Sequence, residues 1–242
     1  NLGQHEIAFR FKDALTTADN HVIYKLGSKE IASAQGMSLT FMAKFNEREG
    51  NSCHIHLSVR SENDEPVMAD AKDPQGLSAL GKSFIAGQLK YMREMTLFFA
   101  PNINSFRRMV PGCYAPLSSN WGYENRTTAL RIPGGDNRAM RIEHRVAGAD
   151  ANPYLTVAAI LAGALHGIEK KLKAPSAVVG DAGDVEPTLP HFWNDAILAF
   201  ERSKFIEEYL GSELRTNYAR CKRQEKQEFD SRVTLLEYDA YL

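Results

Sequence analysis

Two histidines in residues 50–59, GNSCHIHLSV, alternate with apolar side chains. Successive residues of a β-strand point to opposite sides, so His54, His56 and Ser58 would share one face of a strand. Imidazole nitrogens bind divalent metals and exchange protons near neutral pH. Such a face is either an ordinary polar surface or part of a site, and this segment alone does not decide between them.

Charged groups that could complete a site occur on other predicted strands. Glu143 lies between Arg141 and Arg145 on one face of residues 141–146. Glu6 lies on the polar face of a segment near the start of the chain. Further arginines follow in the connecting segments: Arg107, Arg108, Arg126, Arg131 and Arg138. If the strands are neighbours, carboxylates and imidazoles would suit Mg²⁺ or Mn²⁺ and the arginines would suit phosphates; if not, each face is a solvated surface.

The composition is that of an ordinary globular protein. The 242 residues are 43% hydrophobic and 24% charged, with 30 acidic against 29 basic side chains. A formal net charge of −1 gives no electrostatic reason to expect a nucleic-acid or membrane partner. Three separated cysteines suit a reducing compartment, so we expect a cytoplasmic location. The sequence contains no P-loop, no dinucleotide-binding glycine motif and no closely paired cysteines for a zinc site.

The elements that must position these groups divide the chain into a strand-rich part, residues 1–150, and a helical part, residues 151–242. Alternation of apolar and polar residues predicts strands at 6–12, 38–44, 54–59, 127–132 and 141–146. Strands followed by helices indicate an α+β fold.

The predicted helices have recognisable ends. Helical spacing covers residues 76–99, and Pro101 follows as a stop signal. A second helix over 154–172 begins after Asn152-Pro153, a cap followed by a proline suited to the first turn. Residues 102–125 between them are predicted to form a lid or binding loop.

Several motifs in order resemble those of the glutamine synthetase catalytic domain. They are GQHEI at 3–7, GNSCHIHLS at 50–58, RRMVPGCYAP at 107–116, NRTTALRIP at 125–133, RIEHR at 141–145 and ANPYL at 151–155. The resemblance implies the antiparallel sheet of the glutamine synthetase and guanido kinase catalytic domains, with a helical C-terminal part. It further implies that residues 1–242 are the C-terminal part of that domain, without the family's N-terminal β-grasp domain and the start of the catalytic domain.

The resemblance also implies metal and glutamate ligands. Glu6 is expected to bind a first divalent ion, Mg²⁺ or Mn²⁺, and His54 with Glu143 a second. Three residues match positions that bind substrate glutamate and the transferred phosphate: Gly50, Arg108 and Arg145.

A further set of residues matches the family's nucleotide-binding positions. His56 and Ser58 are expected near the ATP, and Arg126 and Arg131 at its phosphates, with Arg126 also catalytic. Arg138 and Arg141 are expected close by. The implied reaction phosphorylates the γ-carboxylate of glutamate with ATP, after which an amine displaces phosphate.

One departure from the family pattern concerns the amine. Ammonia-using members have a glutamate at the position of Tyr114, and WGYENR at 121–126 is similar to the branch that makes γ-glutamyl amides of larger amines, such as γ-glutamylputrescine. We therefore expect putrescine or another alkylamine as acceptor. The alternatives are a glutamine synthetase that uses ammonia and a non-catalytic family member. Full-length relatives form rings, so a dodecamer-like homo-oligomer is expected, and this segment alone is expected to be inactive.

Overall fold

Four short strands form the single sheet of the described chain, which comprises residues 3–134 and 139–242 of the computed structural model. The strands are β1 (Ile55–Leu57), β2 (Trp121–Tyr123), β3 (Leu130–Ile132) and β4 (Ile142–His144), in the order β1-β4-β3-β2. β4 is antiparallel to both β1 and β3. β2 and β3 are parallel, so the sheet is mixed and the expectation of an antiparallel sheet is corrected at this edge.

The parallel pair arises from a tight loop between β2 and β3. Glu124 follows β2 with a φ of 49°, which turns the chain away from the strand direction. Oγ1 of Thr128 lies 2.9 Å from the carbonyl oxygens of both Asn125 and Leu130, so its hydroxyl ties the loop to the start of β3. After this loop, β3 runs parallel to β2.

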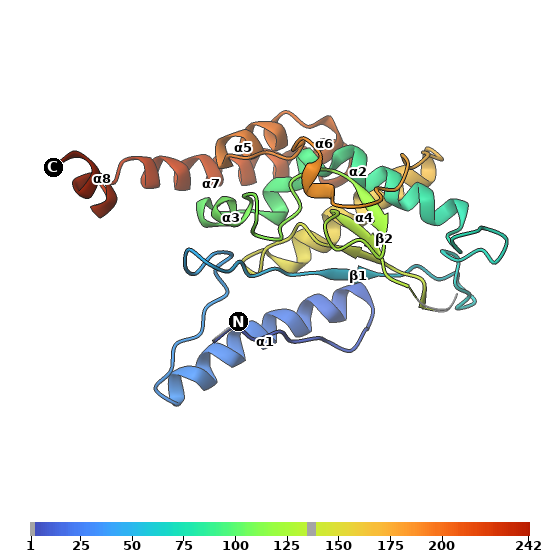
Figure 1. Ribbon diagram of the computed structural model, residues 1–242, viewed down its shortest axis with the longest axis horizontal. Helices are drawn as coiled ribbons and strands as arrows, with labels where there is room; N and C mark the ends of the chain where they lie inside the picture. Colours follow the sequence, from blue (N-terminus) through green and yellow to red (C-terminus); the bar gives the residue numbers. More distant parts are fainter. Residues whose placement is uncertain (1–2, 135–138) are drawn as a thin grey trace.

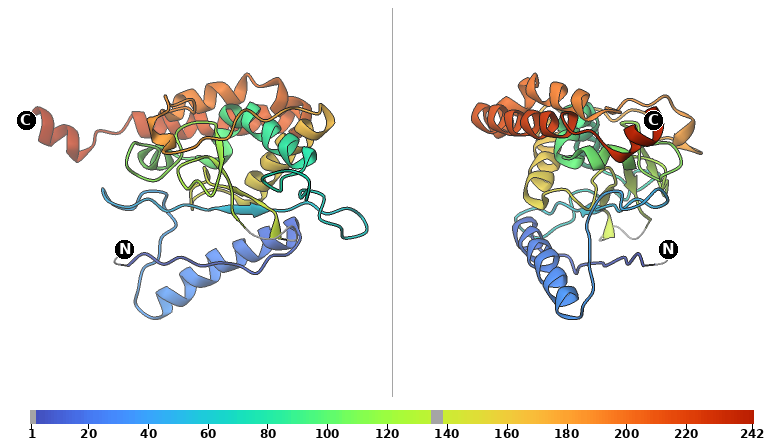
Figure 2. Two further views of the ribbon diagram at one scale, coloured as in Figure 1. Left: turned by 45° about the vertical axis from the view of Figure 1, so that its right-hand side comes forward. Right: turned by 90° about the vertical axis from the view of Figure 1, so that its left-hand side faces the viewer.

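Helices lie on both sides of the sheet (Figures 1 and 2). α1 lies below β1 in Figure 1, whereas the other long helices lie above it. The helical elements are α1 (Ala14–Ala34), α2 (Ala79–Phe99), α3 (Ile103–Arg108), α4 (Pro153–Glu169), the 3-10 turn η2 (Ala182–Asp184), α5 (Trp193–Glu201), α6 (Lys204–Leu210), α7 (Ser212–Asp230) and α8 (Leu235–Tyr241).

The core forms where α2 crosses α4. A Cβ atom on Gly87 would collide with the backbone of Gly163 and Gly167, so these glycines allow the two helices to touch. Phe84, Met95 and the remaining core residues pack around this crossing and against the sheet. The expected helices at 76–99 and 154–172 are confirmed, and Asn152 accepts hydrogen bonds from the first turn of α4.

Part of the predicted strand content is wrong. Residues 6–12 and 38–44 form no strand in the described chain, and residues 14–34 form α1. A strand needs a neighbouring backbone to take its hydrogen bonds, and residues 6–12 are exposed on both faces, with Phe11 92% exposed. The loop expected at 102–125 contains α3 and β2.

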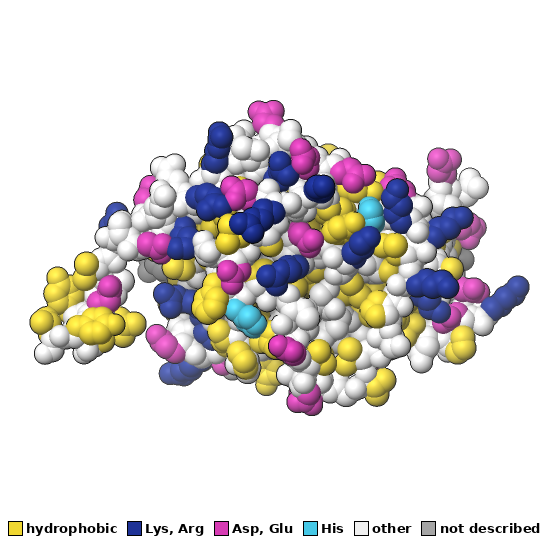
Figure 3. All heavy atoms as spheres, turned by 90° about the horizontal axis from the view of Figure 1, so that it is seen from above, with side chains coloured by type: hydrophobic (Ala, Val, Ile, Leu, Met, Phe, Trp, Pro, Cys, Tyr) yellow, Lys and Arg dark blue, Asp and Glu magenta, His cyan; other side chains and the backbone are white. Residues whose placement is uncertain are grey.

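The helical side presents a mixed surface. In Figure 3, lysines and arginines alternate with acidic residues over this face, and apolar side chains gather on α8 at one end. Leu235 and Leu236 of α8 are 82% and 75% exposed. No helix among the described residues is long and apolar enough to cross a membrane.

Candidate active site

The sheet register aligns the predicted site residues. His56 lies opposite Glu143, and Glu143 lies opposite Arg131 on its other side. Residues opposite each other on neighbouring strands share one face of a sheet. His54, His56 and Ser58 are exposed, whereas the apolar residues between them are partly buried, so the predicted alternation is confirmed.

Glu143 is the centre of this face. Its Oε1 lies 3.2 Å from Nδ1 of His54 and 2.8 Å from Nη1 of Arg145, and its Oε2 accepts from Arg131 at 3.0 Å. The side chain is only 4% exposed. Burial alone would raise the pKa of Glu143, but His54, Arg145 and Arg131 together hold it far below the ordinary value. The carboxylate is therefore ionised at any physiological pH.

Glu124 is a member of this network that the sequence did not single out. Its Oε2 lies 2.6 Å from Nη2 of Arg131, and its Oε1 accepts from the backbone N–H of Gly134. These two donors lower the pKa of Glu124. The acidic residue within WGYENR was visible, but its pairing with Arg131 depends on the turn after β2.

The predicted nucleotide-binding residues occupy the exposed side of the same network. Arg141 donates from Nε to Nδ1 of His56 at 3.3 Å. Burial lowers the pKa of His56, and Arg141 adds to this effect against the opposing influence of Glu143. Ser58 and Arg126 are exposed, and the charge of Arg126 contributes to the lowered pKa of Glu124. Arg138 lies outside the described residues.

Two predicted glutamate-binding residues touch each other. A Cβ atom on Gly50 would lie 2.6 Å from Cγ of Arg108, so only glycine fits over this side chain. Arg108 is 1% exposed and donates to Ser52 Oγ at 3.0 Å and to the carbonyl oxygen of Val146. Burial lowers the pKa of Arg108 to about 10, so the guanidinium stays charged near neutral pH. Within the described part of the chain, no hydrogen-bond partner is found for the buried Nε of Arg108 or for that of Arg145.

The residues expected to bind metal are brought together only in part. His54 and Glu143 are in contact and offer an imidazole and a carboxylate, the donor chemistry that suits Mn²⁺ or Mg²⁺. Glu6 does not join them: the described residues contain no group of three or more His, Cys, Asp or Glu positioned for a metal ion. The segment before Glu6 nevertheless contacts residues 50 and 51, since Gln4 donates to the Gly50 carbonyl at 3.0 Å and to the Asn51 side chain at 2.6 Å.

Tyr114 lies on a loop away from these contacts. Its side chain is 88% exposed and its φ is 54°, a conformation that a bulky residue rarely adopts. The preceding residue, Cys113, accepts a hydrogen bond from Lys44 Nζ at 2.8 Å. The structure therefore does not bring Tyr114 into contact with the glutamate network.

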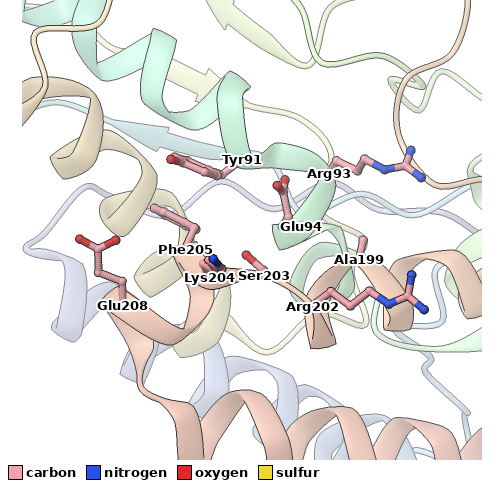
Figure 4. Close-up of a pocket in the computed structure, with 9 residues that line it drawn as sticks. All are labelled: Tyr91, Arg93, Glu94, Ala199, Arg202, Ser203, Lys204, Phe205 and Glu208. Carbon is pink, nitrogen blue, oxygen red and sulfur yellow. The ribbon is translucent and has the colours of Figure 1, made fainter.

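Two surface hollows lie on the helical side instead. One, of about 390 Å³, is formed by α2, α5 and α6 (Figure 4), and its lining residues are Tyr91, Arg93, Glu94, Ala199, Arg202, Ser203, Lys204, Phe205 and Glu208. The other, of about 560 Å³, includes Lys90, Ser119 and Lys173. Neither of these two hollows includes a predicted site residue.

The domain is a mixed sheet backed by helices, and its candidate site is a buried glutamate held by a histidine and two arginines. Domains of this class suit substrates that carry phosphate and carboxylate groups, because arginines bind both. Within that class the chain belongs to the glutamine synthetase family. Residues 1–241 match the family described as "Glutamine synthetase, catalytic domain".

Known relatives share most of this chain. It is 46% identical over 235 residues to γ-glutamylethanolamide synthetase of Streptomyces coelicolor, covering 97% of this chain and 50% of the relative. It is 39% identical over 240 residues to γ-glutamylputrescine synthetase of Escherichia coli, covering 98% and 50%. A solved structure, the GmaS/ADP complex, superimposes with a TM-score of 0.87 at 32% identity, covering 96% of this chain and 56% of GmaS. The chain thus spans about half the length of the curated relatives it matches.

Proposed function

We propose that the protein to which this chain belongs is an ATP-dependent ligase that joins the γ-carboxylate of glutamate to an alkylamine or polyamine. The family membership, and relatives named for ethanolamide and putrescine products, support this proposal. The observation that carries it is the buried Glu143 cluster, because its ligands come from three of the motif segments. We also propose a ring-shaped homo-oligomer for the full-length protein.

Arg131 and Arg145 supply the positive charge that the reaction requires. Phosphoryl transfer is mainly a task of positioning and charge neutralisation. Each of the two guanidinium groups donates to Glu143 through one nitrogen, and Arg131 also contacts Glu124. We propose that their positive charge attracts the phosphate and carboxylate oxygens of the substrates. Glu124 shares Arg131 with Glu143, and the phosphates of ATP would replace this contact.

His54 and Glu143 are the residues that would hold one divalent ion, with Glu6 contributing to another. A bound Mg²⁺ or Mn²⁺ would neutralise charge on the transferred phosphate. The role of this chain is to hold the two side chains together: His54 Nδ1 lies 3.2 Å from Glu143 Oε1, and His54 directly precedes β1, which pairs with β4.

Nucleotide binding is assigned to the exposed rim of the cluster. His56 and Ser58 extend the same strand face, and Arg141 orients His56 through the hydrogen bond to Nδ1. Arg126 and Arg131 are proposed to contact the ATP phosphates, with Arg126 also assisting transfer. Arg138, which lies outside the described residues, is also proposed to take part in nucleotide binding. The GmaS/ADP complex supports a nucleotide-binding role for this fold.

Tyr114 is proposed to select the acceptor. Replacing a carboxylate by a phenol removes the group that would best bind ammonium, and the aromatic ring with Cys113 offers apolar surface to an alkyl chain. Glutamate is bound by Gly50, Arg108 and Arg145 in this proposal. Arg108 would act by supporting the backbone of Gly50, which lies against its side chain.

The test uses the full-length protein with Mg²⁺ or Mn²⁺. Phosphate release from ATP is expected only when glutamate and an amine are both present, and kcat/KM should be higher for putrescine, ethylamine or ethanolamine than for ammonium. A clear preference for ammonium would show a glutamine synthetase instead. No ATP binding by calorimetry would show a non-catalytic member.

A further inference from the structure

An amine and a thiol meet beside the Tyr114 loop. Lys44 Nζ lies 2.8 Å from Cys113 Sγ. Other nitrogen–sulfur contacts in the described chain are longer: His21 Nδ1 lies 3.9 Å from Cys53 Sγ, and the Val59 amide lies 3.2 Å from Met68 Sδ. The Lys44–Cys113 gap is short enough for one bridging atom.

Lys44 is held in this position from its backbone. Its N–H donates to the Asn104 side chain at 2.9 Å, and its carbonyl accepts from the same side chain at 2.8 Å. The residue also forms a bridge with Gly50, and Nζ donates to the Arg48 carbonyl at 3.1 Å. None of the ion pairs among the described residues joins Lys44 to a carboxylate. The contacts of its amine are with Cys113 Sγ and the Arg48 carbonyl.

Cys113 is fixed by a turn. Its N–H donates to the Val110 carbonyl at 3.3 Å, and it sits between Gly112, with a φ of 81°, and Tyr114. The side chain is partly exposed, so a small oxidant can reach the sulfur from solvent. Both partners are thus held by backbone contacts that do not depend on each other.

We propose that Lys44 and Cys113 are a peroxide-sensitive modification site, in which oxidation joins the two side chains through a single oxygen atom as an S–O–N bridge. The thiolate attacks one hydrogen peroxide to give a sulfenic acid and water. A second peroxide oxidises the amine to a hydroxylamine and a second water. The hydroxylamine oxygen then attacks the sulfenic sulfur and releases a third water. Sulfur and nitrogen each lose two electrons, and each peroxide gains two.

The other cysteines are poor candidates for this chemistry. Burial raises the pKa of Cys53 to about 11, so little thiolate forms near neutral pH. Cys221 is exposed on α7, but no lysine contacts its sulfur among the interactions of the described residues. Cys221 therefore serves as an internal reference for simple oxidation.

The bridge would restrict the loop that carries Tyr114, the residue proposed to contact the amine. It would join the 44–50 hairpin, which carries Gly50, to the loop that carries Tyr114. This consequence rests on the proposed function: a fixed loop could not adjust to an incoming amine, so ligation would slow. Formation of the bridge itself does not require catalysis.

The experiment treats the full-length protein with hydrogen peroxide and maps peptides by mass spectrometry with and without dithiothreitol. The wild type should yield a tryptic species linking Lys44 to Cys113, with a mass gain of one oxygen less two hydrogens, loss of cleavage after Lys44 and reversal by dithiothreitol. Lys44→Arg keeps the cation but cannot form the bridge, and Cys113→Ser removes the sulfur. Cys221→Ser is the matched control and should cross-link like the wild type.

Each result bears on the proposal. A Lys44–Cys113 linked peptide supports it, whatever the activity of the protein. Sulfenic or sulfinic acid on Cys113 without a link to Lys44 would overturn it, and so would oxidation confined to Cys221. Where ligation is measurable, peroxide should remove most of the rate in the wild type, and dithiothreitol should restore it. A linked protein that shows no ligase activity before oxidation would contradict the proposed function while leaving the modification site intact.

Discussion

The sheet face around Glu143 and the loop that carries Tyr114 are built in opposite ways. Glu143 is 4% exposed and is held by Arg131 of β3, by His54 just before β1 and by Arg145 just after its own strand, β4. Tyr114 is 88% exposed and sits in a left-handed backbone conformation. Strand register fixes the first region, whereas the second is held by a turn and by the Lys44–Cys113 contact.

This difference separates the two halves of the proposed reaction. In the proposed reaction the charged cluster would serve glutamate and ATP, and we expect it to tolerate little change because its charges neutralise one another in a buried place. The loop would serve the amine, which differs among the named relatives. Loops vary more easily than the scaffold that carries them, so a change of acceptor need not disturb phosphate chemistry.

The largest effect is expected from Glu143→Gln. The substitution keeps the shape but leaves Arg131, Arg145 and His54 without their common anion, and breaking a buried ion pair costs about 3 kcal/mol. Urea unfolding should show this loss, and ATP-dependent phosphate release should fall by about a hundredfold or more. Glu62→Gln, at an exposed position, is the control. Equal effects of both substitutions would contradict the central role of Glu143.

Acid should reduce the stability that the Glu143 cluster contributes to the fold. The folded-state pKa of Glu143 is depressed, so its stabilising contribution is complete above the ordinary value of 4.5 and is lost as the pH falls through the lower folded value. Stability of the wild type, measured with a chelator present, should therefore decrease more steeply below pH 4.5 than that of Glu143→Gln. Parallel curves for the two proteins would show that the Arg131 and Arg145 contacts contribute little.

Local patterns account for what the sequence predicted of the site. Alternation in residues 54–59 and 141–146 placed His54, His56 and Glu143 on polar faces, because that period is a property of each strand. The resemblance implied that His54 and Glu143 share a site, but the position of His56 opposite Glu143 was not predicted, since register is non-local. Glu124 was missed for the same reason.

The helices whose ends are marked by capping residues or prolines were predicted from the sequence. Asn152 and Pro153 mark the start of α4 within two residues, and Pro101 follows the end of α2. α1 was missed because its apolar residues do not form one stripe: Leu15, Ile23 and Ile31 are all more than half exposed. Burial of Arg108 beneath Gly50 likewise depends on contacts across more than fifty residues.

A smaller and more selective effect is expected from Tyr114→Glu. A carboxylate at this exposed position would attract ammonium and remove apolar surface from larger amines, so the ratio of kcat/KM for ammonium to that for putrescine should rise about tenfold, or roughly 1.4 kcal/mol. Stability should change little, since the side chain is 88% exposed. Tyr241→Glu, at an 86% exposed tyrosine on α8, is the matched control. A fall in both rates by the same factor would place Tyr114 outside acceptor selection.

The smallest effect is expected from Glu124→Gln, at the exposed edge of the Glu143 cluster. Glu124 is 58% exposed and binds Arg131 at 2.6 Å, so solvent screens the pair and its contribution to stability is small. If Glu124 competes with phosphate for Arg131, removing its charge should strengthen ADP binding about threefold, or roughly 0.6 kcal/mol, by calorimetry. Glu62→Gln should leave the affinity unchanged. Weaker binding would instead mean that Glu124 positions Arg131 for the nucleotide, and the rigid region would then extend to the turn after β2.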